Sequence, residues 1–377
     1  MLWHSLIVAF TKGEKMKSKF ALIGLIAGLS AAMSFPAQAR ISGADVHSLI
    51  VAGDPAGSPP DSPDKRVDPN TASSPFSGVV SVSVQYDGQS FICSGTLVSK
   101  RHVVTAGHCI DTDGKGTVVD LTKPGSSVRA VFNASPTPGD PGRGIVTAAA
   151  VAMNPNYHGF GNCPSGVPGF CLNDDIAVVT LNQDAPDAAR IYRAFTGDLA
   201  EGQVFTMVGY GRSGDGVAGY SVDPDFRIKR SGQNVMDLFD RDDEQNFAAG
   251  PNEVWYADFD GKGQDSFCTM FGVCTPILPN DKETNIGGGD SGGATFINRN
   301  GEYFLVGNTT FGGTFQGQTP GAFGTYFGGM MVGAYDDWLE QATGGALISV
   351  VPEPETYALM LAGLGMLPAV ARRRRAR

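Results

Sequence analysis

The sequence predicts an all-β fold. Among its 377 residues are 51 glycines and 23 prolines, which separate short runs rich in Val, Phe and Thr. Three of these runs have the composition or the alternation of strands: 78–86, 204–211 and 302–311. Helical periodicity is scarce and is clearest at 333–343, where Tyr335, Trp338 and Leu339 recur at helical spacing. Many short strands and one late helix favour a β-barrel or a β-sandwich.

The composition predicts a folded, acidic protein. Hydrophobic residues make up 42% of the chain, which is enough for a sizeable core, and the formal net charge is -10. Because phosphate groups are bound by basic surfaces, we expect no nucleic-acid partner.

Residues 1–39 predict a signal peptide. A basic stretch at 16–19 precedes an apolar stretch at 20–33, and the small residues at 37–39 predict cleavage after Ala39. A membrane anchor is the alternative, but the apolar stretch is short for a spanning helix.

The C-terminal segment at 350–377 combines three features. The triplet Pro352-Glu353-Pro354 precedes an apolar stretch of about 15 residues, which could span a bilayer, and then a run of arginines that would stay cytoplasmic. The combination resembles the PEP-CTERM sorting signal of Gram-negative bacteria. This resemblance implies export across the inner membrane to the periplasm, cell surface or extracellular matrix, and removal of the tail by an exosortase-type sorting enzyme. An ordinary tail anchor is the alternative.

Six cysteines in an exported chain predict disulfides. A metal site is the alternative, but the sequence holds no Cys-x-x-Cys pair and no cluster of histidines. We therefore expect neither a metal nor another cofactor. Pairing nearest neighbours along the chain gives three short loops: Cys93–Cys109, Cys163–Cys171 and Cys268–Cys274.

The stretch NIGGGDSGGATF at 285–296 places Ser291 between glycines, either as a nucleophile on a tight turn or only as a turn residue. A serine nucleophile needs a base, and the base needs an orienting carboxylate. All five histidines precede Ser291. This order excludes the α/β-hydrolase arrangement, in which the histidine follows the serine.

His108 is the best candidate for the base. It follows a β-branched run and adjoins Cys109, so a disulfide there would hold the backbone that carries the imidazole. By contrast, His4 and His47 lie in the expected leader and pro-region, and His158 lies in a loop.

Two motifs, RHVVTAGHC at 101–109 and GGGDSGG at 287–293, together resemble the trypsin-like serine peptidases of the chymotrypsin fold. That family has an aspartate followed by a hydrophobic run between them. NDDIAVVTL at 173–181 supplies Asp175, with Asp174 expected as a solvated neighbour. Four further segments share the resemblance: 91–99, 208–212, 307–313 and 334–342.

The resemblance covers 67–345 and implies two six-stranded antiparallel β-barrels, at about 67–190 and 191–345, with a short C-terminal helix. His108 and Asp175 would come from the first barrel and Ser291 from the second. The resemblance also implies the disulfide between the cysteines at 93 and 109.

The implied activity is hydrolysis of peptide bonds in proteins or peptides. His108 would accept the proton of Ser291 as it attacks the carbonyl, and Asp175 would orient the imidazole. The backbone N–H groups of Gly289 and Ser291 would form the oxyanion hole.

Residues 40–66 are expected to be a pro-region or a linker, with 53–65 disordered. In the family, the aspartate before the nucleophile, here Asp290, often pairs with an N-terminal amine made by cleavage. Cleavage at Arg66-Val67 would place this amine at a suitable distance from the disulfide and the histidine. However, the residues that follow lack the usual hydrophobic pair and glycine.

The resemblance also assigns a substrate pocket: Asn285, Thr310, Phe311, Gly312 and Gly321. By count back from the serine, Asn285 falls at the base of the primary pocket, and Gly312 and Gly321 fall at its walls. An uncharged base and open walls favour large, uncharged substrate side chains.

Two other functions are possible for such a chain: a catalytically silent protease-fold protein that binds a partner, or a structural protein of the extracellular matrix. Silent relatives usually lose a catalytic residue. This chain retains all three and the oxyanion glycine, which favours the enzyme.

Overall fold

The computed structural model describes residues 50–315 and 317–350. The predicted signal peptide and the PEP-CTERM segment with its apolar stretch lie outside these residues. Most of the described elements are strands, and the two α-helices are short: α2 (Ser266–Phe271) and α3 (Asp336–Ala342). None of the helices in the described ranges has the length and apolar composition to cross a bilayer. The predicted all-β class with a short C-terminal helix is confirmed.

The first barrel closes in the order β1-β2-β3-β6-β5-β4, with every neighbouring pair antiparallel. Its interior is filled by β-branched side chains such as Val82, Val128 and Val179, because alternate residues of a strand face the same side. Its strands are β1 (Val79–Tyr86), β2 (Gln89–Leu97), β3 (His102–Thr105), β4 (Ser127–Val131), β5 (Ile145–Met153) and β6 (Ala177–Leu181).

The second barrel follows the path β11-β8-β14-β15-β16-β13-β12, and β7 (Ala194–Phe195) and β17 (Ser349–Val350) extend the sheet beside β15. Only Met236 and Asp237 separate β11 from β12, so the two ends of the path are consecutive in the chain. If β11 and β12 are counted as one bent strand, the sheet closes into a barrel of six strands. The path consists of β8 (Val204–Gly209), β11 (Arg230–Val235), β12 (Leu238–Arg241), β13 (Asn252–Asp258), β14 (Ala294–Arg299), β15 (Glu302–Gly313) and β16 (Tyr326–Met331).

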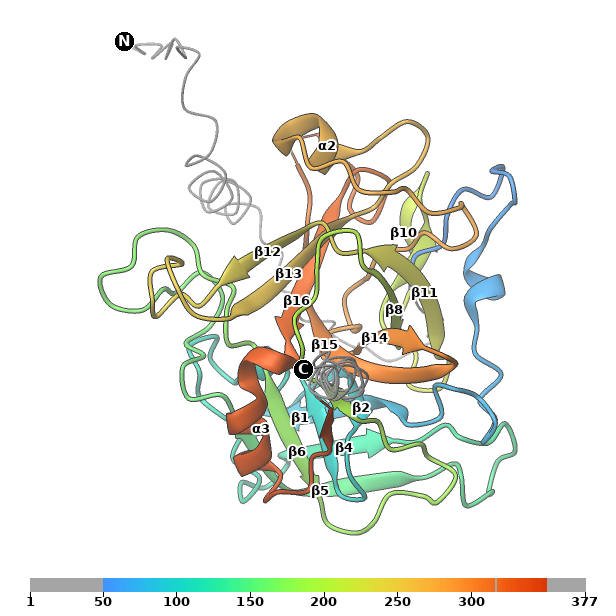
Figure 1. Ribbon diagram of the computed structural model, residues 1–377. Coiled ribbons are helices and arrows are strands. Elements are labelled where there is room, and N and C mark those ends of the chain that lie inside the picture. The colour runs from blue at the N-terminus through green and yellow to red at the C-terminus, as the bar shows by residue number, and fades with distance from the viewer. Residues whose placement is uncertain (1–49, 316, 351–377) are drawn as a thin grey trace, which may run out of the picture.

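The two barrels pack against each other through a shared core. Val104 and Val178 of the first barrel belong to the same buried cluster as Val208 and Leu305 of the second. Leu339 of α3 is buried in this cluster too, so the C-terminal helix reinforces the contact between the barrels. Figure 1 shows the β1–β6 barrel below and the β8–β16 sheet above it, with α3 beside the first barrel.

Residues 50–66, which we call the strap, are folded, and this finding corrects the prediction of disorder. Residues 53–65 were expected to be disordered, but the strap packs along the second barrel and ends in the 3-10 helix η2 (Pro63–Arg66). Ile50 and Val51 are fully buried, and the Ala52 N–H donates to the Gly214 carbonyl at 2.9 Å. The Pro- and Ser-rich composition concealed these anchors because burial depends on a partner that is remote in the sequence.

All six cysteines form the three disulfides that nearest-neighbour pairing predicted: Cys93–Cys109, Cys163–Cys171 and Cys268–Cys274.

Candidate active site

His108 lies on a short turn that directly follows a barrel strand. β3 ends at Thr105, and the 3-10 helix η3 (Gly107–Cys109) carries His108 at its centre. The disulfide from Cys109 to Cys93 of β2 ties this turn to the barrel. The imidazole therefore has a rigid support, and only 12% of the side chain is exposed.

Asp175 reaches His108 because β3 and β6 pair antiparallel. The register places Thr105 opposite Ala177, so the turn after β3 lies beside the segment before β6. Asp175 is fully buried. Its Oδ1 accepts the His108 backbone N–H at 2.7 Å, and its Oδ2 lies 2.6 Å from Nδ1 of the ring. An ionised carboxylate only accepts hydrogen bonds, so Nδ1 is the donor and the neutral ring keeps a lone pair on Nε2.

Ser291 lies on the glycine-rich turn at 287–293, just before β14. The Asp290 N–H donates to the Gly287 carbonyl at 2.9 Å, which closes the turn ahead of the serine. Ser291 is buried, with 6% of the residue exposed.

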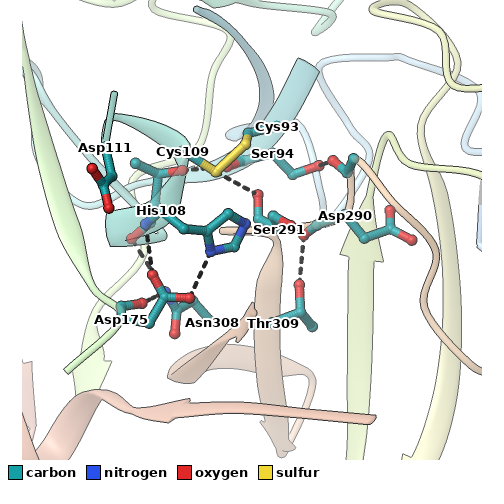
Figure 2. Close-up of a disulfide and its surroundings, with 12 residues drawn as sticks. Cys93, Ser94, His108, Cys109, Asp111, Asp175, Asp290, Ser291, Asn308 and Thr309 are labelled. Atoms are coloured by element: carbon teal, nitrogen blue, oxygen red, sulfur yellow. Dashed lines mark hydrogen bonds and ion pairs between the residues drawn. A yellow bond between two sulfur atoms is a disulfide. The ribbon is translucent and has the colours of Figure 1, made fainter. Parts of the chain in front are cut away.

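The three predicted triad residues meet between the barrels. Figure 2 shows the imidazole of His108 between the Asp175 carboxylate and Ser291. Nε2 of His108 is buried and has no hydrogen-bond partner among the described residues. Asn308 of β15 joins these segments, since its Nδ2 donates to the carbonyls of Thr105 at 3.1 Å and Asp175 at 3.3 Å. A hydroxyl, an imidazole and a buried carboxylate in this order can transfer a proton from the hydroxyl to the ring.

Residues 68–225 match the family model described as Trypsin, a range that contains His108 and Asp175 and ends before Ser291. This range of the chain is similar to trypsin-family domains. Residues 350–375 match the PEP-CTERM protein-sorting motif, which marks export to the cell surface or extracellular space in Gram-negative bacteria. The protein is therefore an exported protein with a trypsin-like fold.

Among solved structures, the chain is similar to the crystal structure of the scabies mite inactivated protease paralogue S-I1. The two chains are 19% identical with a TM-score of 0.43, and the match covers 74% of this chain and 99% of the other. None of the curated proteins matches the chain.

Ser94 is a site residue that sequence reasoning missed. It lies fully buried in β2, beside Cys93, and reaches across to the second barrel. Its N–H donates to the Ser291 carbonyl at 2.8 Å, and its Oγ donates to the Gly289 carbonyl at 2.9 Å. The same Oγ accepts the Tyr210 N–H at 2.9 Å. Its position directly after the bonded cysteine is the only sequence signal that could have drawn attention to it.

Asp290 is a buried carboxylate held by backbone N–H groups. Oδ1 accepts from Gly211 at 2.7 Å and Oδ2 accepts from Gly287 at 2.9 Å. Burial nevertheless raises the pKa of Asp290 to about 7. A cationic partner would stabilise this carboxylate as an anion.

The structure does not support Val67 as that partner. Val67 is 39% exposed and pairs with Arg230 of β11. It lies along the edge of β11 that faces away from β8. Arg66, at the expected cleavage site, is buried in an ion pair with Asp61, with 2.5 Å between Nη2 and Oδ2. The bond between Arg66 and Val67 is therefore part of a folded element and not an exposed cleavage loop.

The segment that does lie beside the 287–293 turn includes Ile50 and Val51. The Val51 N–H donates to the Asn285 carbonyl at 3.3 Å, and Ile50 is buried in the same cluster as Ile286. Ile50 and Val51 are a hydrophobic pair followed two residues later by Gly53. This is the pattern that the residues after Arg66 lack, and it was present in the sequence.

The predicted pocket residues fall in three places. Asn285 is buried, and its Nδ2 donates to Thr325 Oγ1 at 2.7 Å. Three others follow one another near the end of β15: Thr310, Phe311 and Gly312. Gly321 lies against Tyr220, since a Cβ added there would be 2.6 Å from the ring. An added Cβ at Gly312 would make only ordinary contacts, so this edge of the strand is open.

Proposed function

We propose that the protein is an exported serine endopeptidase that uses His108, Asp175 and Ser291. One observation carries the proposal. Asp175 contacts His108 at both the backbone N–H and Nδ1, which leaves Nε2 unpartnered beside Ser291. A histidine with a merely structural role would be expected to satisfy both ring nitrogens when buried.

In the proposed reaction, Nε2 of His108 accepts the Ser291 hydroxyl proton as Oγ attacks a peptide carbonyl. The imidazolium is stabilised by the Asp175 carboxylate and then protonates the leaving amine. Water attacks the acyl-enzyme with the same base, which releases the acid and restores Ser291.

The developing oxyanion would be bound by the N–H groups of Gly289 and Ser291. Neither group donates to an acceptor in the described hydrogen bonds, so both are available to a ligand. Gly289 has φ +106, in the left-handed region that favours glycine, and an added Cβ would lie 2.9 Å from the Gly211 Cα. Loss of one such donor typically costs about 100- to 1000-fold in kcat.

Activation would follow cleavage between Leu49 and Ile50. The new amine at Ile50 would pair with the Asp290 carboxylate, whose pKa is raised by burial even though the charge of Arg230 favours the anion. The tail would be recognised by an exosortase through Pro352-Glu353-Pro354 at the inner membrane, in line with the sorting motif.

The test is an intact-mass measurement of the exported protein after treatment with a fluorophosphonate, with Ser291→Ala as the control. We expect one adduct on the wild type and none on the variant, on chains that begin at Ile50. A wild-type chain that begins at Ile50 and takes no adduct would contradict the proposal and favour a binding role. An unlabelled chain that still carries residues before Ile50 would indicate a zymogen, and labelling would then be repeated after cleavage.

A further inference from the structure

Four carboxylates meet next to Asp175, contributed by two parts of the chain that are about 70 residues apart: the segment before β6, and the loop after β12 with the start of β13. One oxygen from each lies within 4.8 Å of the others. We call them the carboxylate cluster: Asp174, Asp243, Glu244 and Glu253. Within the described ranges, none of the four forms an ion pair with a lysine, an arginine or a histidine.

The cluster is buried and poorly satisfied. Asp174, Asp243 and Glu253 are 3%, 2% and 6% exposed, which contradicts the expectation that Asp174 is solvated. Oδ1 of Asp243 has no hydrogen-bond partner in the described part of the chain. Glu253 accepts only a neutral donor, the Asn173 amide, at 2.6 Å. Buried carboxylate oxygens are normally paired, so an unpartnered one within a group of four carboxylates is suited to contact a cation.

The arrangement is unfavourable for four anions alone. Four carboxylate oxygens lie within 4.8 Å of one another, and in the described part of the chain no lysine, arginine or histidine is paired with any of them. The cluster therefore needs either bound protons or a cation.

We propose that the carboxylate cluster binds a divalent cation, specifically Ca²⁺. All four ligands are carboxylate oxygens, with no sulfur or nitrogen, which selects a hard cation. Oxygens at about 2.3–2.6 Å from one Ca²⁺ ion lie no more than about 5 Å apart. The four carboxylate oxygens lie within 4.8 Å of one another, so they are close enough to share one ion. Ca²⁺ also tolerates irregular geometry, whereas Mg²⁺ requires a nearly ideal octahedron. Glu244 is exposed and gives the ion a path from solvent.

The site would stabilise the segment that carries Asp175. Asp174 has φ +65, a left-handed conformation that is uncommon outside glycine although aspartate adopts it more readily than most residues, and its N–H donates to the Tyr335 hydroxyl at 2.9 Å. The hydrogen bond to Tyr335 fixes the backbone of Asp174, and a cation bound to the Asp174 carboxylate would fix its side chain as well. The binding claim stands independently of the proposed function, whereas a link to catalysis through Asp175 rests on it.

The experiment uses the exported chain with Ser291→Ala, which prevents self-digestion and makes the result independent of peptidase activity. The protein is freed of metal with a chelator, then titrated with CaCl₂ or MgCl₂ by calorimetry and by thermal unfolding. We expect saturable Ca²⁺ binding at about 10⁻⁴–10⁻³ M, as in other extracellular Ca²⁺ modules, a higher Tm, and weaker binding of Mg²⁺.

Two variants test the location. Asp243→Asn and Glu253→Gln should each weaken Ca²⁺ binding at least about tenfold, as for loss of a metal contact, while Glu201→Gln on an exposed turn should leave it unchanged. In chelator, Asp243→Asn should be at least as stable as the parent because it removes a buried like charge. The proposal would be overturned if Ca²⁺ at about 10 mM neither bound to the parent protein nor raised its Tm. That result would indicate that bound protons neutralise the cluster. Binding that neither variant weakens would also overturn it, and would place the ion at the second acidic group: Asp258, Asp260 and Asp265.

Discussion

Asp175 contacts His108 twice, through its backbone N–H and through Nδ1, so it orients both the turn and the ring. Asp175→Asn keeps the shape but replaces one acceptor with an amide donor, which favours the wrong imidazole tautomer. We expect kcat on a peptide substrate to fall by about 10⁴-fold with little change in Tm. A fall of less than about tenfold would show that Asp175 does not orient the base.

Ser94 is expected to position the 287–293 turn, because its Oγ donates a hydrogen bond to the Gly289 carbonyl from the opposite barrel. Ser94→Ala removes this bond and leaves the Tyr210 N–H unsatisfied, which should cost about 1–3 kcal/mol in the free energy of unfolding. A small displacement of the turn should lower kcat by about 10- to 100-fold with KM nearly unchanged.

Ser81→Ala is the matched control for Ser94. Ser81 is also fully buried in the first barrel, and its Oγ donates across the interface to the Phe226 carbonyl at 2.8 Å and not to the 287–293 turn. This variant should lose stability without a loss of kcat. Equal kcat values for the two variants would assign Ser94 a purely structural role.

Among the elements, the strap depends on one buried ion pair. The Arg66 guanidinium donates through Nε and Nη2 to Asp61 Oδ2, and through Nη2 to the Glu283 carbonyl at 2.9 Å. Arg66→Ala leaves the Asp61 carboxylate buried and unpaired, so urea unfolding should show a loss of about 3–5 kcal/mol. Lys65→Ala, one residue earlier and exposed, should change stability by no more than about 0.5 kcal/mol. A loss below about 1 kcal/mol for Arg66→Ala would indicate that the strap contributes little to the folded state.

The same contacts predict resistance to proteolysis. Because the Arg66 side chain is buried, added trypsin should not cleave after Arg66 in the folded protein, whereas exposed basic sites such as Arg101 should be open to attack. Rapid cleavage after Arg66, detected by peptide mass, would revive Val67 as the mature N-terminus.

At the scale of the whole molecule, buried carboxylates predict an unusual dependence of stability on pH. Burial raises the pKa of Asp174 and Asp260 to about 9 and that of Glu253 to about 8, so the folded protein binds protons that the unfolded chain releases. Since the native state holds more protons here, the free energy of unfolding falls as pH rises. His102, with a pKa lowered by burial, opposes this trend below pH 6.5, and Lys229, with a pKa of about 8, opposes it above pH 8.

Urea unfolding in chelator should therefore give a larger free energy of unfolding at pH 6.5 than at pH 8, and added Ca²⁺ should reduce the difference. Equal stability at the two pH values in chelator would show that these carboxylates are not protonated in the folded protein.

The short motifs of this chain carried much of the information by themselves. The alternation of strand residues indicated the fold class, and neighbouring cysteines indicated the three disulfides, because these features depend on residues close in sequence. The motifs around His108 and Ser291 likewise contain their own turns and glycines, so the two segments were identified before their contact was known.

Other features were decided only by tertiary structure. Asp174 was expected in solvent, yet its surroundings come from the loop after β12 and from β13, more than sixty residues away. The strap looked disordered by composition, but Ile50 is buried by a loop more than two hundred residues further on. Ser94 gains its role from a carbonyl at position 289. Burial and charge pairing are properties of segments brought together by the fold, so local sequence determined the reacting groups and the tertiary structure determined what holds them.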